Sequence, residues 1–203
     1  MQAVAPSYDV LLQASRRLDW RFLMTEPELG RVACIGVHDP ELVESLRLFS
    51  AMLTASEAAP TAAEESSYDL VVLRNPAAED LPAALPLLRP GGWLYVEVQG
   101  PLNRRRSGRS RSASGYARAL RRLGLVEVGV NMHWPDFGSC RAIVPLDDAV
   151  AVRHALARGK IRGRARLVMR LAPVLAATRL LATVVPCSSA VGRRAVAGEE
   201  GAP

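Results

Sequence analysis

Residues 87–100 read Leu-Leu-Arg-Pro-Gly-Gly-Trp-Leu-Tyr-Val-Glu-Val-Gln-Gly, a pattern that indicates the end of a helix, a turn and a strand. The Pro-Gly-Gly segment supplies the turn, and the apolar residues after it are typical of a buried strand. An earlier apolar run at 68–76 also ends in a turn, and residues 115–124 have the spacing of a short amphipathic helix that leads into another strand. This alternation of strands and helices predicts an α/β fold.

The N-terminal third continues the same alternation. Asp39 suits the N-cap of a helix and Pro40 its first position, so a helix should begin there. The expected elements are a leading helix at 8–23, a strand at 31–37, a helix at 41–49 and a short strand at 50–55. Further along, residues 126–134 and 141–144 are expected to form a hairpin, followed by a helix that runs to about Arg158.

The order of elements from 68 to 130, with Leu-Arg-Pro-Gly-Gly before a strand, resembles the C-terminal half of class I S-adenosylmethionine (SAM)-dependent methyltransferases. The resemblance covers roughly residues 10–146 and implies a three-layer Rossmann-like α/β sandwich. It also implies SAM as cofactor and methyl transfer to a small molecule or biosynthetic intermediate. We therefore expect a methyltransferase-like α/β domain at 1–148 and a basic, partly apolar helical extension at 149–203.

The cofactor loop departs from the family pattern. In this family the first strand runs into an acidic-x-Gly-x-Gly-x-Gly turn, whose glycines let the backbone approach SAM closely. Residues 34–40 read Cys-Ile-Gly-Val-His-Asp-Pro, so only Gly36 matches, and the side chains of His38 and Pro40 narrow the cleft. The resemblance places Gly36, His38 and Asp39 on the methionine side of the cofactor.

Two further positions complete the expected cofactor site. The family has an acidic residue at the end of the second strand, which binds the ribose hydroxyls, and Glu57 is the candidate here. Asn75 and Pro76, after the strand at 68–74, are assigned to the floor of the cleft. A solvated loop residue at 57 and a simple turn at 75–76 are the alternatives.

The sheet is expected to be shortened at one edge. Only ten residues separate Glu57 from Tyr68. A crossover unit needs about 10–12 residues beyond its strands, so another helix and strand do not fit between them. The missing glycines and the shortened sheet together support an alternative function, a methyltransferase-like accessory or binding subunit that has lost SAM binding.

No catalytic residue is assigned. The histidines are the natural candidates for a general base, and for each a structural role is the competing interpretation: His38, His133 and His154. The sequence shows no Ser-His-Asp set, no phosphate-binding loop and no zinc-ligand spacing, so we expect no metal. Cys34 and Cys140 are expected to be buried, reduced thiols in strands, which favours a cytoplasmic setting.

Positive charge is concentrated in the second half of the chain. Residues 1–100 hold 7 Arg and 14 Asp or Glu, whereas residues 101–203 hold 18 Arg, one Lys and 6 Asp or Glu. An arginine-rich loop is expected after the strand that ends near residue 100, where it would bind an anionic substrate or an acidic partner protein: Arg104, Arg105, Arg106, Arg109 and Arg111. A solvated loop is the alternative, and nucleic acid is not favoured because no aromatic residues interleave with these arginines.

A second basic segment lies in the C-terminal extension. Arg158, Arg162, Arg166 and Arg170 recur every fourth residue, and an apolar run follows at 167–185. Pro173 and two arginines interrupt this run, which argues against a membrane-spanning helix. A helix at an anionic membrane surface, over 158–185, is one interpretation, and a helix docked on the domain or on a partner is the other.

Overall fold

The computed structural model describes residues 6–57, 66–77, 79–99, 112–158, 185 and 187–198. The strands are β1 (Leu29–Ile35), β2 (Ser50–Ser56), β3 (Tyr68–Arg74), β4 (Leu88–Gln99), β5 (Leu125–Trp134), β6 (Ala142–Pro145) and β7 (Cys187–Arg194). The helices are α1 (Tyr8–Arg17), α2 (Pro40–Phe49), α3 (Asp80–Ala84), α4 (Ala113–Arg122) and α5 (Ala149–Arg158), with short 3-10 helices η1 (Asp19–Leu23) and η3 (Leu85–Leu87).

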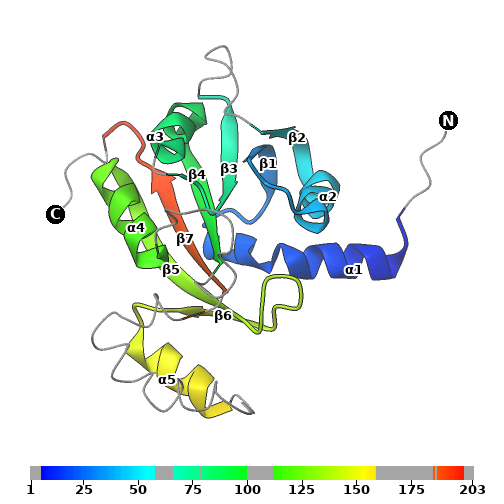
Figure 1. The fold of residues 1–203 in the computed structure, drawn as a ribbon. Coiled ribbons are helices and arrows are strands. Elements are labelled where there is room, and N and C mark those ends of the chain that lie inside the picture. The colour runs from blue at the N-terminus through cyan, green and yellow to red at the C-terminus, as the bar shows by residue number, and fades with distance from the viewer. Residues whose placement is uncertain are drawn as a thin grey trace.

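Within these residues the strands form one seven-stranded sheet in the order β2-β1-β3-β4-β7-β5-β6 (Figure 1). Strands β2, β1, β3 and β4 are parallel, β7 is antiparallel to both β4 and β5, and β6 is antiparallel to β5. Helices cover both faces of the sheet. The predicted three-layer, Rossmann-like α/β fold is confirmed.

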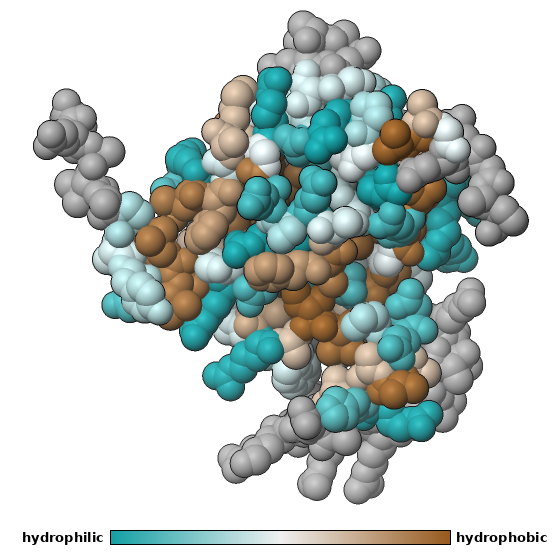
Figure 2. All heavy atoms as spheres, turned by 180° about the vertical axis from the view of Figure 1, so that it is seen from behind, coloured by the Kyte–Doolittle hydropathy of each residue, from teal (hydrophilic) through white to brown (hydrophobic). Residues whose placement is uncertain are grey.

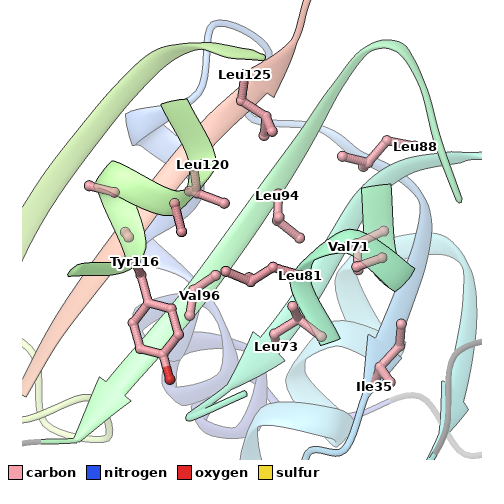
Figure 3. Packing of buried hydrophobic residues seen from close by; sticks show 14 of the residues in the cluster. Ile35, Val71, Leu73, Leu81, Leu88, Leu94, Val96, Tyr116, Leu120 and Leu125 are labelled. Carbon is pink, nitrogen blue, oxygen red and sulfur yellow. The ribbon is translucent and has the colours of Figure 1, made fainter. Parts of the chain in front are cut away.

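The central strands are buried on both faces, which explains their unbroken apolar runs. In β3, Val71 and Leu73 face α3 and α4, while Leu70 and Val72 face the opposite layer. Figure 3 shows the first of these cores, where Tyr116 and Leu120 of α4 lie over the sheet beside α3. The opposite core contains the buried side chains of η1 and α2.

Local sequence signals place the helix that follows β1. The Asp39 carboxylate accepts hydrogen bonds from the N–H groups of Glu41 and Leu42 at 3.1 and 3.2 Å, and Pro40 is the first residue of α2. The predicted cap and helix are therefore confirmed. This cap also fixes the Asp39 side chain beside the ends of the parallel strands.

Helix α1 is attached by its C-terminal end. Of its residues only Ala14 and Arg17 are buried, and Figure 2 shows exposed apolar side chains gathered over its projecting part, where Tyr8, Val10 and Leu11 are exposed. No helix among the described residues is long and apolar enough to cross a membrane.

The C-terminal segment departs from the sequence expectation. Residues 149–203 were expected to form a helical extension, and α5 is helical, but residues 187–194 form β7 in the middle of the sheet. The expected boundary at residue 148 thus separates one strand of the sheet from the others. The basic and apolar segment at 159–184, which carries the membrane-surface interpretation, lies outside the described residues.

One smaller expectation is confirmed and another needs correction. Strand β2 lies at the edge of the sheet and only residues 57–67 connect it to β3, so the shortening expected at this edge is confirmed. The described residues nevertheless form seven strands, because β7 and β6 extend the sheet on its other side. Cys34 lies buried in β1 as expected, whereas Cys140 lies in the connection between β5 and β6 and is half-buried.

We predict that a chain ending at residue 186 does not fold, because removal of β7 leaves β4 and β5 without their shared partner. Circular dichroism during heating should show no cooperative transition for this truncation. A chain ending at residue 198 keeps β7 and is the matched control, with a transition like that of the full chain. A cooperative transition in the shorter chain would show that the sheet closes without β7.

Candidate functional site

A buried ion pair lies at the carboxyl ends of the parallel strands, where ligands bind in folds of this class. Arg17, the last residue of α1, donates from Nη1 to Glu97 Oε1 at 2.7 Å and from Nη2 to Oε2 at 2.9 Å. Its side chain is 1% exposed and that of Glu97, in β4, is 0% exposed. A bidentate pair of this kind satisfies both charges without water.

Two partly exposed charges, Asp39 and Arg74, extend the pair into a network of four side chains. Asp39 accepts from Arg17 Nη2 at 3.2 Å and also from Arg74 Nη1, and Arg74 Nε lies 3.8 Å from Glu97 Oε2. The side chains of Asp39 and Arg74 are 17% and 20% exposed. Burial alone would raise the pKa of Asp39, but Arg17, the Leu42 N–H and Arg74 outweigh it and hold that pKa below the ordinary 3.8. Asp39 is therefore expected to be charged near neutral pH.

A second polar cluster lies behind this network, among β4, β5 and β7. His133 Nε2 is 2.9 Å from Ser189 Oγ, and the Tyr95 ring stacks on Trp20 with centroids 3.8 Å apart. Burial, helped by Arg17, lowers the pKa of His133 to about 3, so the imidazole is neutral at physiological pH. Because His133 is buried and neutral, the geometry supports a structural role for this residue and not a role as general base.

Beside the network a cavity of about 160 Å³ opens at the ends of β1, β2 and β3. Four of the six predicted cofactor residues line it: Gly36, Glu57, Asn75 and Pro76. The remaining lining residues are Ile35, Leu73, Arg74, Asp80 and Ala83. Small-molecule sites usually measure about 300–1,000 Å³, so this cavity accommodates part of a ligand of that size.

The backbone explains why these residues meet. Gly36 has φ of +62°, a conformation that favours glycine, and its N–H donates to the Ser56 carbonyl at 2.9 Å. This bond brings the turn after β1 beside Glu57, which follows β2. Asn75 is fixed at the end of β3, because its N–H donates to the Glu97 carbonyl and its Oδ1 accepts from the Gln99 N–H, both at 2.8 Å.

The other predicted site residues lie elsewhere. His38 does not line the cavity; it points into solvent, with Nδ1 4.0 Å from Glu57 Oε1. Asp39 caps α2 and joins the charged network instead of lining the cavity. The arginine-rich loop lies outside the described residues: Arg104, Arg105, Arg106, Arg109 and Arg111.

Sequence reasoning missed Arg17, Arg74 and Glu97. One signal was present for Glu97, since it is a single acid inside the apolar run Trp-Leu-Tyr-Val-Glu-Val. A carboxylate in a strand buried on both faces requires a partner. Nothing in the sequence identifies that partner as Arg17, which lies 80 residues away.

Comparison with known proteins supports the fold. No protein-family model matches the sequence, and neither does any curated protein sequence. A SAM-dependent methyltransferase from Archaeoglobus fulgidus superposes with a TM-score of 0.51 at 13% identity, covering 91% of this chain and 93% of that one. A phosphoethanolamine N-methyltransferase from Haemonchus contortus, in complex with phosphomonomethylethanolamine and S-adenosylhomocysteine, gives 0.51 at 13% identity and covers 93% of this chain and 53% of that one. At such identities the likeness establishes the fold alone.

We predict that Arg17→Met lowers the free energy of unfolding by about 3–5 kcal/mol, because Glu97 is left charged and buried without its bidentate partner. Urea unfolding measures the change, with Arg16→Met, at an exposed position of the same helix, as control. The double variant R17M/E97M should be less destabilised than the sum of its single changes. A loss below about 1 kcal/mol for Arg17→Met would contradict a stabilising role for the pair.

A pH dependence follows from the depressed pKa of Asp39. The folded state holds the charged carboxylate, so this stabilisation is complete above the ordinary pKa of 3.8 and is lost as the pH falls through the lower folded pKa. Asp39→Asn keeps an N-cap residue but removes the charge. The difference in unfolding free energy between the wild type and Asp39→Asn should therefore shrink as the pH falls below 3.8. Urea unfolding from pH 6 downward tests this, and a difference that stays constant would contradict it.

Proposed function

We propose that the protein is a SAM-dependent methyltransferase that acts on a small molecule or biosynthetic intermediate. One observation carries the proposal: Gly36, Glu57 and Asn75 come from three separate strand ends and line one cavity at the carboxyl edge of the sheet. The methyltransferase fold supports it, because this edge is where ligands bind in doubly wound sheets.

The cavity suits the nucleoside part of SAM. The Glu57 side chain is 90% exposed at the end of β2, where its carboxylate is available to accept hydrogen bonds from both ribose hydroxyls. At Gly36 a Cβ would have only the Glu57 carbonyl oxygen nearby, at 3.9 Å, so the glycine leaves open space against the backbone. Glu57 would hold the ribose and Gly36 would allow its close approach.

The charged network suits the methionine part. Asp39 and Arg74 are partly exposed and carry the two charges that complement an ammonium and a carboxylate. In the absence of a ligand they are paired with each other. Binding of the amino-acid end of SAM would thus replace the Asp39–Arg74 ion pair by ion pairs with the ligand. No further charged side chain would have to be buried.

The chemistry requires little more from the chain. Bound SAM supplies an electrophilic methyl group on a sulfonium. The residues of the site would contribute alignment of the acceptor with that methyl group, and His133 is too buried and too weakly basic to remove a proton. The proposal assigns no general base.

A non-catalytic accessory or binding subunit is the second candidate. Two observations favour it: the cavity of about 160 Å³ is small for a whole cofactor, and Arg17 and Glu97 are buried and paired with each other. In this function the same network would serve stability alone.

Calorimetric titration with S-adenosylhomocysteine separates the two candidates. We expect micromolar affinity for the wild type and a loss of about tenfold or more for Glu57→Ala, because two hydrogen bonds to a charged acceptor are removed. Glu57 is exposed, so its loss should leave the thermal transition unchanged. Glu44→Ala, an exposed glutamate on α2, is the matched control and should bind as the wild type does.

Absence of binding at millimolar ligand, by protein with a normal thermal transition, would overturn the proposal in favour of the accessory subunit. Binding that Glu57→Ala leaves unchanged would remove Glu57 from the site. Gly36→Trp gives a second check, since an indole would fill the space at the turn. Its positive φ makes that change strained, so its thermal transition has to be measured alongside.

A further inference from the structure

A second, larger hollow lies between α1 and the connection from β5 to β6. Its volume is about 870 Å³, within the range of about 300–1,000 Å³ that is usual for small-molecule sites. One wall is a single face of α1, whose residues recur at helical spacing: Asp9, Leu12, Gln13 and Arg16. Asp19 and residues 138–141 complete the lining. We refer to this hollow as the α1 groove.

The wall opposite α1 is held in place by its own contacts. Asp136 accepts hydrogen bonds from the N–H and the hydroxyl of Ser139, at 2.7 and 2.8 Å. Phe137 is buried, and the guanidinium carbon of Arg17 lies 5.5 Å from the centre of its ring. The groove is therefore formed by an ordered turn and a helix that the buried ion pair anchors.

Two arginines and two aspartates line the groove. Within the described residues, the side chains of Arg16 and Arg141 are exposed and make no hydrogen bond or ion pair. Burial raises the pKa of Asp19 above the ordinary 3.8, and Arg21, which does not line the groove, and Arg16 offset this only in part. Asp9 lies in the first turn of α1, where the helix dipole favours a carboxylate.

The groove and the cofactor cavity adjoin the same charged network. Arg16 in the groove precedes Arg17 of the network, and Arg74 of the network lines the cofactor cavity. A ligand in the groove and a ligand in the cavity would thus both lie next to this network. That arrangement suits an acceptor and a cofactor bound side by side.

We propose that the α1 groove binds the acceptor substrate, and that the acceptor carries a compact anionic group, a carboxylate or a phosphate, held by Arg16 and Arg141. The role as acceptor site rests on the proposed methyltransferase function. The preference for an anion does not, and it can be measured without SAM.

Cys140 provides a reporter inside the groove. It lines the groove and is half-buried, whereas Cys34 and Cys187 are buried. Its rate of modification can be compared for dithiobis(nitrobenzoate), a disulfide with two carboxylates, and for neutral dithiodipyridine. Both reagents react with the same thiolate, so the ratio of the two rates reports attraction of the anion and cancels the effect of any change in the Cys140 pKa.

We expect this ratio to fall about threefold or more in Arg16→Gln and in Arg141→Gln, because each change removes a positive charge close to the path of a dianion. Arg122→Gln, an exposed arginine of α4, is the matched control and should leave the ratio unchanged. Inorganic phosphate or malonate should slow modification by the dianion in the wild type but not in R16Q/R141Q. Whichever of the two ions competes more effectively then indicates whether the groove prefers a phosphate or a carboxylate.

An unchanged ratio in both single variants would overturn the anion preference. Failure of Cys140 to react with the neutral reagent, judged by mass spectrometry against Cys140→Ser, would show that the groove is closed to small molecules and would also overturn the proposal. Neither outcome bears on S-adenosylhomocysteine binding at Glu57, so the failure of this inference and the failure of the proposed function can be told apart.

Discussion

The ion pair between Arg17 and Glu97 is the contact on which the arrangement of the site depends. Neither charge is accessible to water, so each requires the other, and breaking the pair would leave a buried charge without compensation. Through this pair α1 is fixed to the centre of the sheet, although the helix buries little else. Asp39 and Arg74 extend the pair to the cap of α2 and to the end of β3, so that one network connects α1, α2, β3 and β4.

The same network gives the site its two compartments. One compartment is the small cavity at Gly36 and Glu57, and the other is the α1 groove, where Arg16 and Arg141 make no hydrogen bond or ion pair with other described residues. In the proposed function the partly exposed charges of Asp39 and Arg74 would exchange partners with the amino-acid end of SAM, whereas Arg17 and Glu97 are too deeply buried to do so. A division between exchangeable and fixed charges is what a binding site attached to a stable core requires.

Much of the fold follows from local patterns, and less of the site does. The turn and strand at 87–99 and the cap at Asp39 are set by neighbouring residues, and Gly36, Glu57 and Asn75 meet because parallel strands end at one edge. Strand β7 was missed because Cys-Ser-Ser-Ala-Val-Gly-Arg-Arg is mostly small or polar, and its buried serines are explained only by partners such as His133. The Arg17–Glu97 pair joins residues far apart in the chain, and no local pattern encodes such a partner. Cys140 lies outside a strand because β6 begins two residues later, at Ala142.

A crystal structure of the protein grown with saturating S-adenosylhomocysteine tests the account most directly. The account predicts adenosine in the cavity lined by Gly36 and Asn75, with both ribose hydroxyls on Glu57 and the amino-acid end on Asp39 and Arg74. Arg17 and Glu97 should remain paired as they are here. A cavity without ligand under those conditions, or a ligand bound away from Glu57, would contradict the cofactor site.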